Sequence, residues 1–183
     1  MSEICLGTMW FGTRTDEETS FELLDRSIEA GGRVERARDL AGGRPAFTNL
    51  QLRHSYLRPR LDVREPGDHA FADASDEVLD YVRAEPAMRL WAYSPLLKGG
   101  YSGKPLDGVY DHPGTPARLA ALHAVAEEAG ATPNQVVIAW LLAHDVVPVV
   151  GVSSLAQLEE TLAARDLKLD EPAVRRLDGV TGL

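Results

Sequence analysis

The apolar residues of this chain concentrate in four short runs, at residues 4–9, 46–52, 88–94 and 146–150. Each run is nearly continuous, which is typical of strands buried on both faces of a sheet. The last run is rich in β-branched valine, and it shows no alternation of apolar and polar positions. The pattern therefore predicts four short strands, the last of them covered on both faces.

Segments with apolar residues at helical spacing lie between these runs. The spacing predicts helices over residues 16–30, 75–85, 117–129 and 132–143, and from Ser153 or Ser154 to Leu162, with short helices at 34–40 and at the C-terminus. Residues 59–71 and 95–116 contain several prolines and glycines and are predicted to be loops. Strands that alternate with helices in this way predict an α/β fold with a parallel sheet.

Composition places the chain among ordinary globular proteins. Its 183 residues, 44% of them hydrophobic, suit a single domain over residues 1–183. Nineteen basic residues against 28 acidic ones give a net charge of −9, and such a surface repels nucleic acid and anionic membranes. The sequence therefore predicts neither of these as a partner.

Other classes of protein are excluded by what the chain lacks. A single cysteine, Cys5, excludes an internal disulfide and a thiolate metal cluster, and the five histidines lack metal-ligand spacing. We therefore predict no metal site. The sequence has no apolar run of about 18 residues and no secretory signal at its start, so we expect a cytoplasmic protein.

Two segments at strand ends have residues suited to an anionic nucleotide. Gly151, Ser153 and Ser154 follow the last strand and open a helix, whose N-terminus attracts phosphate; the alternative is a strand–helix turn with ordinary serine caps. The segment from Tyr93 to Lys104 offers an aromatic ring, glycines and two lysines, which suit a stacked ring and a diphosphate. Its alternative is a flexible surface loop.

A third segment, residues 6–12, reads Leu-Gly-Thr-Met-Trp-Phe-Gly at the end of the first strand; alone it is equally a tight turn with a hydrophobic plug. Together the three segments, in this order, resemble the aldo-keto reductases, which are NADP-dependent (β/α)8-barrel oxidoreductases. The resemblance runs from residue 4 to residue 177. It implies an α/β fold, a partial TIM barrel of about four parallel strands with flanking helices, equivalent to strands one, six, seven and eight of the family.

The resemblance also assigns a cofactor site. It implies NADP, with NAD as the alternative, because serines stand where the family often has a base near the 2′-phosphate and Thr161 replaces the usual asparagine. By this resemblance the nicotinamide would lie beside Gly7, Thr8, Met9 and Gln51 and under Tyr93, and the diphosphate beside Ser94, Leu96, Gly99 and Lys104. The adenosine end would lie beside Ser153, Gln157, Glu160 and Thr161, while Gly151 would let the ligand approach the backbone.

The family's catalytic Asp, Tyr, Lys and His have no match in the chain, so no catalytic residue is assigned. The sequence passes from the first strand–helix unit to the equivalent of the fifth helix, which indicates an internal deletion near residues 32–33. Tyr56, Tyr93, Tyr101 and His54 are candidates for a substitute proton donor, with ordinary stacking or packing roles as the alternative. Three functions follow: reduction of a small carbonyl substrate, non-catalytic nucleotide binding or regulation, or an inert remnant.

The strands that remain would form an open half-barrel. Open strand edges and an uncovered apolar face favour association, so the sequence predicts either a homodimer that covers the half-barrel or a poorly soluble fragment.

Overall fold

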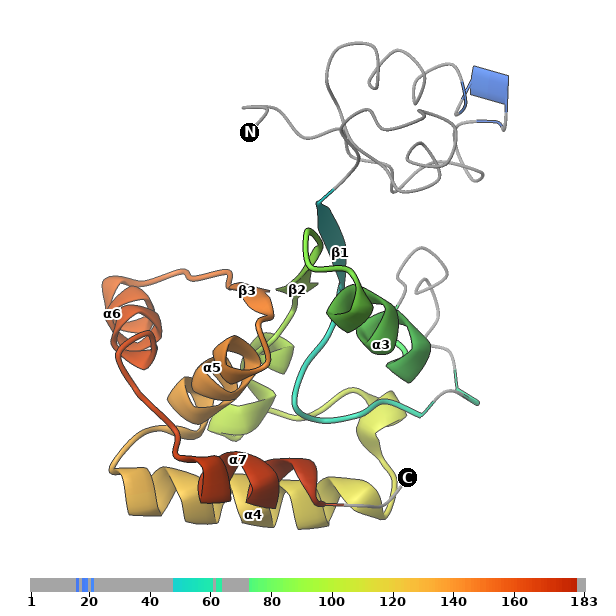
Figure 1. Cartoon of the computed structure of the whole chain (residues 1–183). Helices are drawn as coiled ribbons and strands as arrows, with labels where there is room; N and C mark the ends of the chain where they lie inside the picture. The colour runs from blue at the N-terminus through green and yellow to red at the C-terminus, as the bar shows by residue number, and fades with distance from the viewer. Residues whose placement is uncertain are drawn as a thin grey trace. The chain divides into compact units, whose positions relative to one another are not determined.

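The computed structural model describes residues 16, 18, 19, 21, 48–60, 62, 63 and 73–180 (Figure 1). The chain divides into two compact units. One consists of Met1–Leu50 with Glu77–Arg89, and the other of Gln51–Asp76 with Leu90–Leu183. The predicted strand at 4–9, the helices at 16–30 and 34–40, and the junction near residues 32–33 lie outside the described residues, apart from isolated positions.

The described strands form one three-stranded parallel sheet in the order β1-β2-β3. They are β1 (Asn49–Arg53), β2 (Arg89–Tyr93) and β3 (Val147–Val149). The register of β2 and β3 pairs Trp91 with Val147 and Tyr93 with Val149. Three of the four predicted strands are thus confirmed, each shorter than predicted or shifted by a few residues, and the α/β class is confirmed with them.

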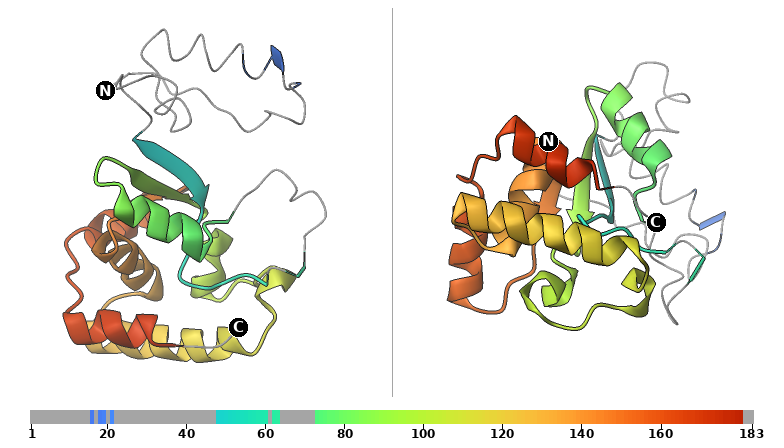
Figure 2. Two further views of the ribbon diagram at one scale, coloured as in Figure 1. Left: turned by 45° about the vertical axis from the view of Figure 1, so that its right-hand side comes forward. Right: turned by 90° about the horizontal axis from the view of Figure 1, so that it is seen from below.

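Four helices of the larger unit follow the predicted pattern. They are α4 (Gly114–Ala129), α5 (Pro133–Ala143), α6 (Leu155–Ala164) and α7 (Glu171–Asp178). α5 packs against α4, α6 and β3, and α4 and α7 lie side by side in each view (Figures 1 and 2). α4 begins three residues earlier than predicted, and the predicted loop before it contains two short 3-10 helices, η2 (Leu97–Ser102) and η3 (Gly108–Tyr110).

Local sequence explains where α5 begins. The Thr132 side chain accepts a hydrogen bond from the backbone N–H of Gln135, and the Gln135 side chain accepts one from the backbone N–H of Thr132. This capping box is followed by Pro133 in the first turn, where its missing N–H costs nothing. All residues from 136 to 141 are buried, so α5 is the central helix of the larger unit's core.

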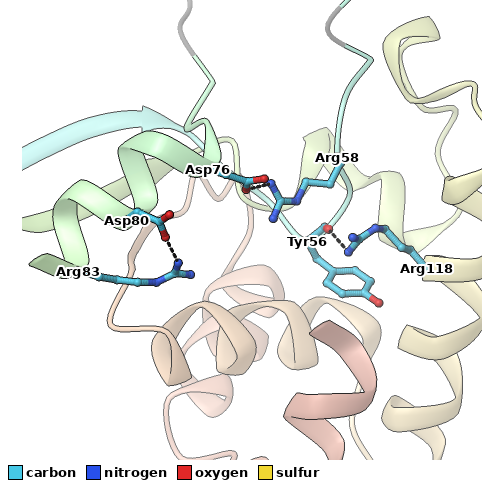
Figure 3. A network of polar contacts seen from close by, with 6 residues as sticks. All are labelled: Tyr56, Arg58, Asp76, Asp80, Arg83 and Arg118. Carbon is cyan, nitrogen blue, oxygen red and sulfur yellow. Dashed lines mark hydrogen bonds and ion pairs between the residues drawn. The ribbon is translucent and has the colours of Figure 1, made fainter. Parts of the chain in front are cut away.

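The smaller unit contains most of α3 (Asp76–Ala84). This helix ends before Pro86, as predicted, and Leu79 is its buried residue. Arg83 donates to Asp80 on the exposed side of the helix, at 2.9 Å (Figure 3). The backbone N–H of Arg89 donates to the carbonyl of Thr48, at 2.8 Å.

The prediction that the last strand is covered on both faces is wrong. Val149 is 37% exposed and Trp91, on β2, is 38% exposed, whereas Leu90 and Ala92, on the opposite face of β2 from Trp91, are almost fully buried. β3 is an edge of the described sheet and contains Pro148, a residue that sheets tolerate at edges. An unbroken apolar run indicates burial, but it does not show that other elements cover both faces of the strand. No helix in the described ranges is long and apolar enough to cross a membrane.

Candidate functional site

The two segments predicted to bind a nucleotide both follow the carboxyl ends of neighbouring strands. Tyr93 and Val149 are the last residues of β2 and β3 and are paired in the parallel register. The segments that follow them, residues 94–104 and 150–154, therefore start from adjacent strand ends. In open parallel sheets, ligands bind outside the carboxyl ends of the strands. Gln51 is exposed on β1, the strand beside β2, whereas Gly7, Thr8 and Met9 lie outside the described residues.

The segment after β2 has an unusual backbone. Ser94, Leu97 and Lys98 adopt positive φ angles of 53°, 48° and 56°, although none of them is glycine. Such conformations each cost of order 1 kcal/mol and persist only where the surroundings enforce them. Gly99, at φ 99°, lies against the Lys104 side chain, because a Cβ at this glycine would be 2.9 Å from the Lys104 Cδ. The loop is thus folded tightly on itself.

A buried tyrosine anchors this loop to the segment after β1. The Ser55 hydroxyl donates to the carbonyl of Pro95 at 2.6 Å, so it accepts from the Tyr101 hydroxyl at 2.7 Å. The Tyr101 oxygen in turn accepts from the backbone N–H of Leu57 at 2.9 Å. Burial raises the pKa of Tyr101 far above its ordinary value, so the phenol stays protonated. The loop is therefore anchored, and the alternative of a flexible surface loop does not hold.

The loop presents positive charge at its surface. Lys98 Nζ lies 3.6 Å from a carboxylate oxygen of Asp107, which neutralises it in part. Lys104 is exposed and has no ion-pair partner within the described ranges. In a protein of net charge −9, this uncompensated ammonium is a local attraction for an anion.

The turn after β3 is open. A Cβ built on Gly151 would meet no atom within 4 Å, so a ligand can approach the backbone there. Ser154 caps α6 by accepting from the backbone N–H of Gln157 at 3.3 Å. The Gln157 side-chain oxygen accepts from the backbone N–H and the hydroxyl of Ser153, at 2.8 and 3.1 Å. Ser153 and Gln157, both predicted for the adenosine end, are thus brought together within a helix cap.

Glu160 is engaged within the protein. One of its carboxylate oxygens accepts from the Thr132 hydroxyl at 2.6 Å, and both lie 3.4 Å from the Asn134 side-chain nitrogen. Asn134 also donates to the Ser102 hydroxyl oxygen at 2.8 Å. Sequence reasoning missed Asn134 and Ser102. The cap at Thr132 places Asn134 in the first turn of α5, but no local pattern pairs it with a loop 32 residues away. Thr161, on the same helix as Glu160, is half-buried.

Three of the candidate proton donors are occupied by packing. The Tyr56 ring is fully buried against Trp140, with centroids 5.4 Å apart, and its hydroxyl donates to the Leu177 carbonyl at 3.4 Å. Burial raises the pKa of Tyr56 to about 12, and the nearby Arg118 opposes the shift (Figure 3). His54 is buried and stacks on Trp140, and Tyr101 anchors the loop. Tyr93, half-buried at the strand end, is the remaining candidate.

Comparison with protein families matches residues 50–181 to the aldo/keto reductase family. The chain belongs to the aldo-keto reductase family. The matched range contains both segments at the strand ends but not residues 6–12, whose resemblance to the family stays a prediction. The described sheet and helices are those of a partial barrel of this family.

Curated relatives agree with this family. The uncharacterized oxidoreductase Rv2298 of Mycobacterium tuberculosis is 32% identical over 149 residues, covering 73% of this chain and 42% of the relative. Pyridoxine 4-dehydrogenase of Escherichia coli is 42% identical over 69 residues, covering 37% of this chain and 24% of the enzyme. The aldo-keto reductase chain thus spans less than half the length of these relatives.

Solved structures show the same fold. The thermostable aldo-keto reductase Tm1743, solved with the inhibitor epalrestat, superposes with a TM-score of 0.59 at 20% identity, over 90% of this chain and 54% of that one. A mutant of Gox0644, solved in complex with NADPH, superposes with a TM-score of 0.57 at 17% identity, over 88% of this chain and 52% of the other.

Proposed function

We propose that this aldo-keto reductase chain binds NADP(H) at the carboxyl ends of β2 and β3. The observation that carries the proposal is the register of these strands. Because Tyr93 pairs with Val149, the two segments predicted to bind the nucleotide begin side by side at the carboxyl ends of β2 and β3. The oxidoreductase names of the relatives and the NADPH complex of Gox0644 support the choice of ligand.

The residues at this edge suit the chemical groups of a dinucleotide. Lys104 and the N-terminus of α6 favour the negative charge of phosphates, and the open backbone at Gly151 leaves room for them. Tyr93 offers an aromatic face for the nicotinamide, and Gln51 offers a carboxamide that pairs with another carboxamide. When bound, the nicotinamide supplies a hydride acceptor or donor.

The assignments by resemblance keep their roles in this proposal. Gly7, Thr8 and Met9 complete the nicotinamide end, and Ser94, Leu96 and Gly99 line the diphosphate. Ser153, Gln157, Glu160 and Thr161 hold the adenosine end, with Ser153 or Ser154 toward a 2′-phosphate. Serine hydroxyls bind a phosphate less tightly than a basic side chain would, so NADP is favoured over NAD by a modest factor.

We further propose that carbonyl reduction is lost or slow. Reduction needs an acid that protonates the carbonyl oxygen as hydride arrives at carbon. The internal deletion proposed near residues 32–33 removes the family's tetrad, and Tyr56 and Tyr101 are buried with raised pKa values. The chain then acts as a nucleotide-binding or regulatory module. Turnover of a small aldehyde would instead support the reductase function.

The test is a titration of gel-filtered protein with NADPH and NADH, followed by the quenching of Trp91 fluorescence, since Trp91 is half-exposed on β2. We expect saturable binding. Lys104→Met should weaken it roughly tenfold, because a charge-assisted contact to phosphate is lost. Lys168→Met removes an exposed lysine between α6 and α7 and is the matched control. A folded protein that binds neither nucleotide, or equal effects of the two lysine variants, contradicts the proposal and favours an inert remnant.

Assembly and location stay predictions. Trp91 and Val149 form an uncovered apolar part of the described sheet, which fits the expected homodimer. Sedimentation equilibrium at micromolar concentration should show a dimer, and Trp91→Glu should shift it toward monomer. A monodisperse wild-type monomer would overturn this expectation. A cytoplasmic location is proposed from the composition.

A further inference from the structure

The carboxamide of Asn134 joins two segments of the proposed nucleotide site. Asn134 is on the first turn of α5 and is only 8% exposed. One of its two N–H groups donates to Ser102, the last residue of η2, and the other points at the carboxylate of Glu160 on α6. The loop after β2 and the helix after β3 are therefore linked through one side chain.

The direction of these hydrogen bonds is fixed by Glu160. An ionised carboxylate only accepts, so the nitrogen of the Asn134 carboxamide, and not its oxygen, must face it. The carboxylate is itself held, since Thr132 donates to it at 2.6 Å. Gln135 also donates to the Glu160 backbone carbonyl at 3.3 Å, which keeps this part of α6 at the start of α5.

This orientation determines what Ser102 can do. Because the Ser102 oxygen accepts from Asn134, the hydroxyl hydrogen is available for donation elsewhere. Ser102 is exposed, and no acceptor for its hydrogen lies within the described part of the chain. A donor hydroxyl two residues before an uncompensated lysine, on a loop held by Tyr101, is suited to an oxyanion.

The arrangement also leaves an atom unsatisfied. The side-chain oxygen of Asn134 is buried without a hydrogen-bond partner among the described residues. Buried acceptors without partners are uncommon in proteins. The Asn134 carboxamide is thus oriented so that its nitrogen donates to Ser102 and Glu160, and in this orientation its oxygen has no hydrogen-bond partner among the described residues.

We propose that Asn134 is a positioning residue that directs the Ser102 hydroxyl to donate to the diphosphate of the nucleotide and couples the loop to α6 through Glu160. The inference rests on the proposed nucleotide binding and adds three residues acting in series: Glu160 orients Asn134, and Asn134 orients Ser102. Glu160 has this role whether or not it also touches the adenine.

The test compares Ser102→Ala, Asn134→Asp and the double variant. Asn134→Asp keeps the size of the side chain and removes the donor to Ser102, and it also places a second carboxylate beside that of Glu160, so it breaks the link to α6 as well. We expect each single variant to raise the Kd for NADPH and for NADH by the same factor, about fivefold to tenfold, because both nucleotides contain the diphosphate. The double variant should be no weaker than Asn134→Asp alone, because that substitution already removes the effect of Asn134 on the Ser102 hydroxyl.

Controls separate this inference from nucleotide binding itself. Ser102→Ala leaves one N–H of the buried Asn134 without its acceptor, so a small fall of the unfolding midpoint is expected; because Ser102 itself is exposed, this variant gives a result even if Asn134→Asp folds poorly. Ser153→Ala should weaken NADPH more than NADH and serves as the contrast. If the wild-type chain binds NADPH and Ser102→Ala does not change the Kd, or the two substitutions act additively, the relay is overturned. If the wild-type chain binds neither nucleotide, the proposed function fails first.

Discussion

The two segments that leave the sheet at the proposed site are built in opposite ways. Residues 94–104 contain three non-glycine residues at positive φ and are anchored by the almost fully buried Tyr101. Residues 150–154 have no positive φ, are mostly exposed, and are held by the local cap between Ser154 and Gln157. The loop is arranged before a ligand arrives, whereas the turn is a helix start with open space beside it.

This difference separates stability from binding. Strained backbone in the loop is maintained by interior contacts, so substitutions there should change stability and affinity together. The turn has few contacts to lose, so substitutions there should change affinity alone. Among substitutions in the two segments, loss of the loop's anchor should therefore cost the most stability.

Removing the anchor of the loop should have the largest effect. Tyr101→Phe leaves the Leu57 N–H without its acceptor and the Ser55 hydroxyl without a donor. We expect the free energy of unfolding to fall by about 2 kcal/mol, because buried polar groups without partners cost about 1–3 kcal/mol. Urea unfolding measures this. Tyr56→Phe, which loses one long hydrogen bond of 3.4 Å, is the control and should cost less than half as much. Equal losses of unfolding free energy in the two variants would mean that the hydrogen bonds of Tyr101 do not anchor the loop.

These anchors mark the limit of what the sequence could predict. The sequence predicts β2, β3 and the start of α5 at Thr132-Pro133, because apolar runs and helix caps are local patterns. The sequence does not predict the contact of Tyr101 with Ser55, 46 positions apart, or that of Asn134 with Ser102, 32 positions apart, because no local pattern links such distant residues. The cover over Val149 was mispredicted, because an apolar run does not show which faces of a strand other elements cover.

The candidate site follows the same division. Lys104, Ser153 and Gln157 were predicted from motifs, and the structure shows Ser153 in contact with Gln157. The contact of Glu160 with Thr132 depends on how α5 and α6 pack, which no motif encodes. Sequence motifs can therefore propose residues for this site, whereas their hydrogen-bond partners follow only from the fold.

The buried phenols should make stability depend on alkaline pH. The pKa of Tyr56 rises from 10.0 to about 12, and burial raises that of Tyr101 as well. The unfolded chain loses these protons from about pH 10, whereas the folded chain keeps them, so stability is complete below pH 10 and falls as the pH rises toward 12. Each phenol contributes a slope of at most about 1.4 kcal/mol per pH unit.

Unfolding midpoints between about pH 8 and about pH 11 measure this dependence. Tyr101→Phe should flatten the decline, because phenylalanine has no proton to lose, and adding Tyr56→Phe should flatten it further. A decline that is just as steep in the double variant would assign it to other groups, such as lysines.

A glycine in the loop should show a moderate effect. Gly103 has φ 86°, and a Cβ added there would meet no atom within 4 Å, so the cost of Gly103→Ala is confined to the backbone. We expect a loss of about 1 kcal/mol, measured by urea unfolding, together with weaker NADPH binding as Lys104 shifts. Gly130→Ala, at φ 60° in the cap of α4, is the matched control. It should cost a similar amount and leave the Kd unchanged.

The corresponding glycine of the turn should show the smallest effect on stability. Gly151 lacks a positive φ and has open space where a β-carbon would lie, so Gly151→Ala should change the free energy of unfolding by less than about 0.5 kcal/mol. The added methyl group would nevertheless occupy the space through which a phosphate reaches the N-terminus of α6. We therefore expect the Kd for NADPH to rise several-fold at constant stability. An unchanged Kd would mean that no phosphate approaches this backbone, and that Ser153 and Ser154 are ordinary caps of a helix.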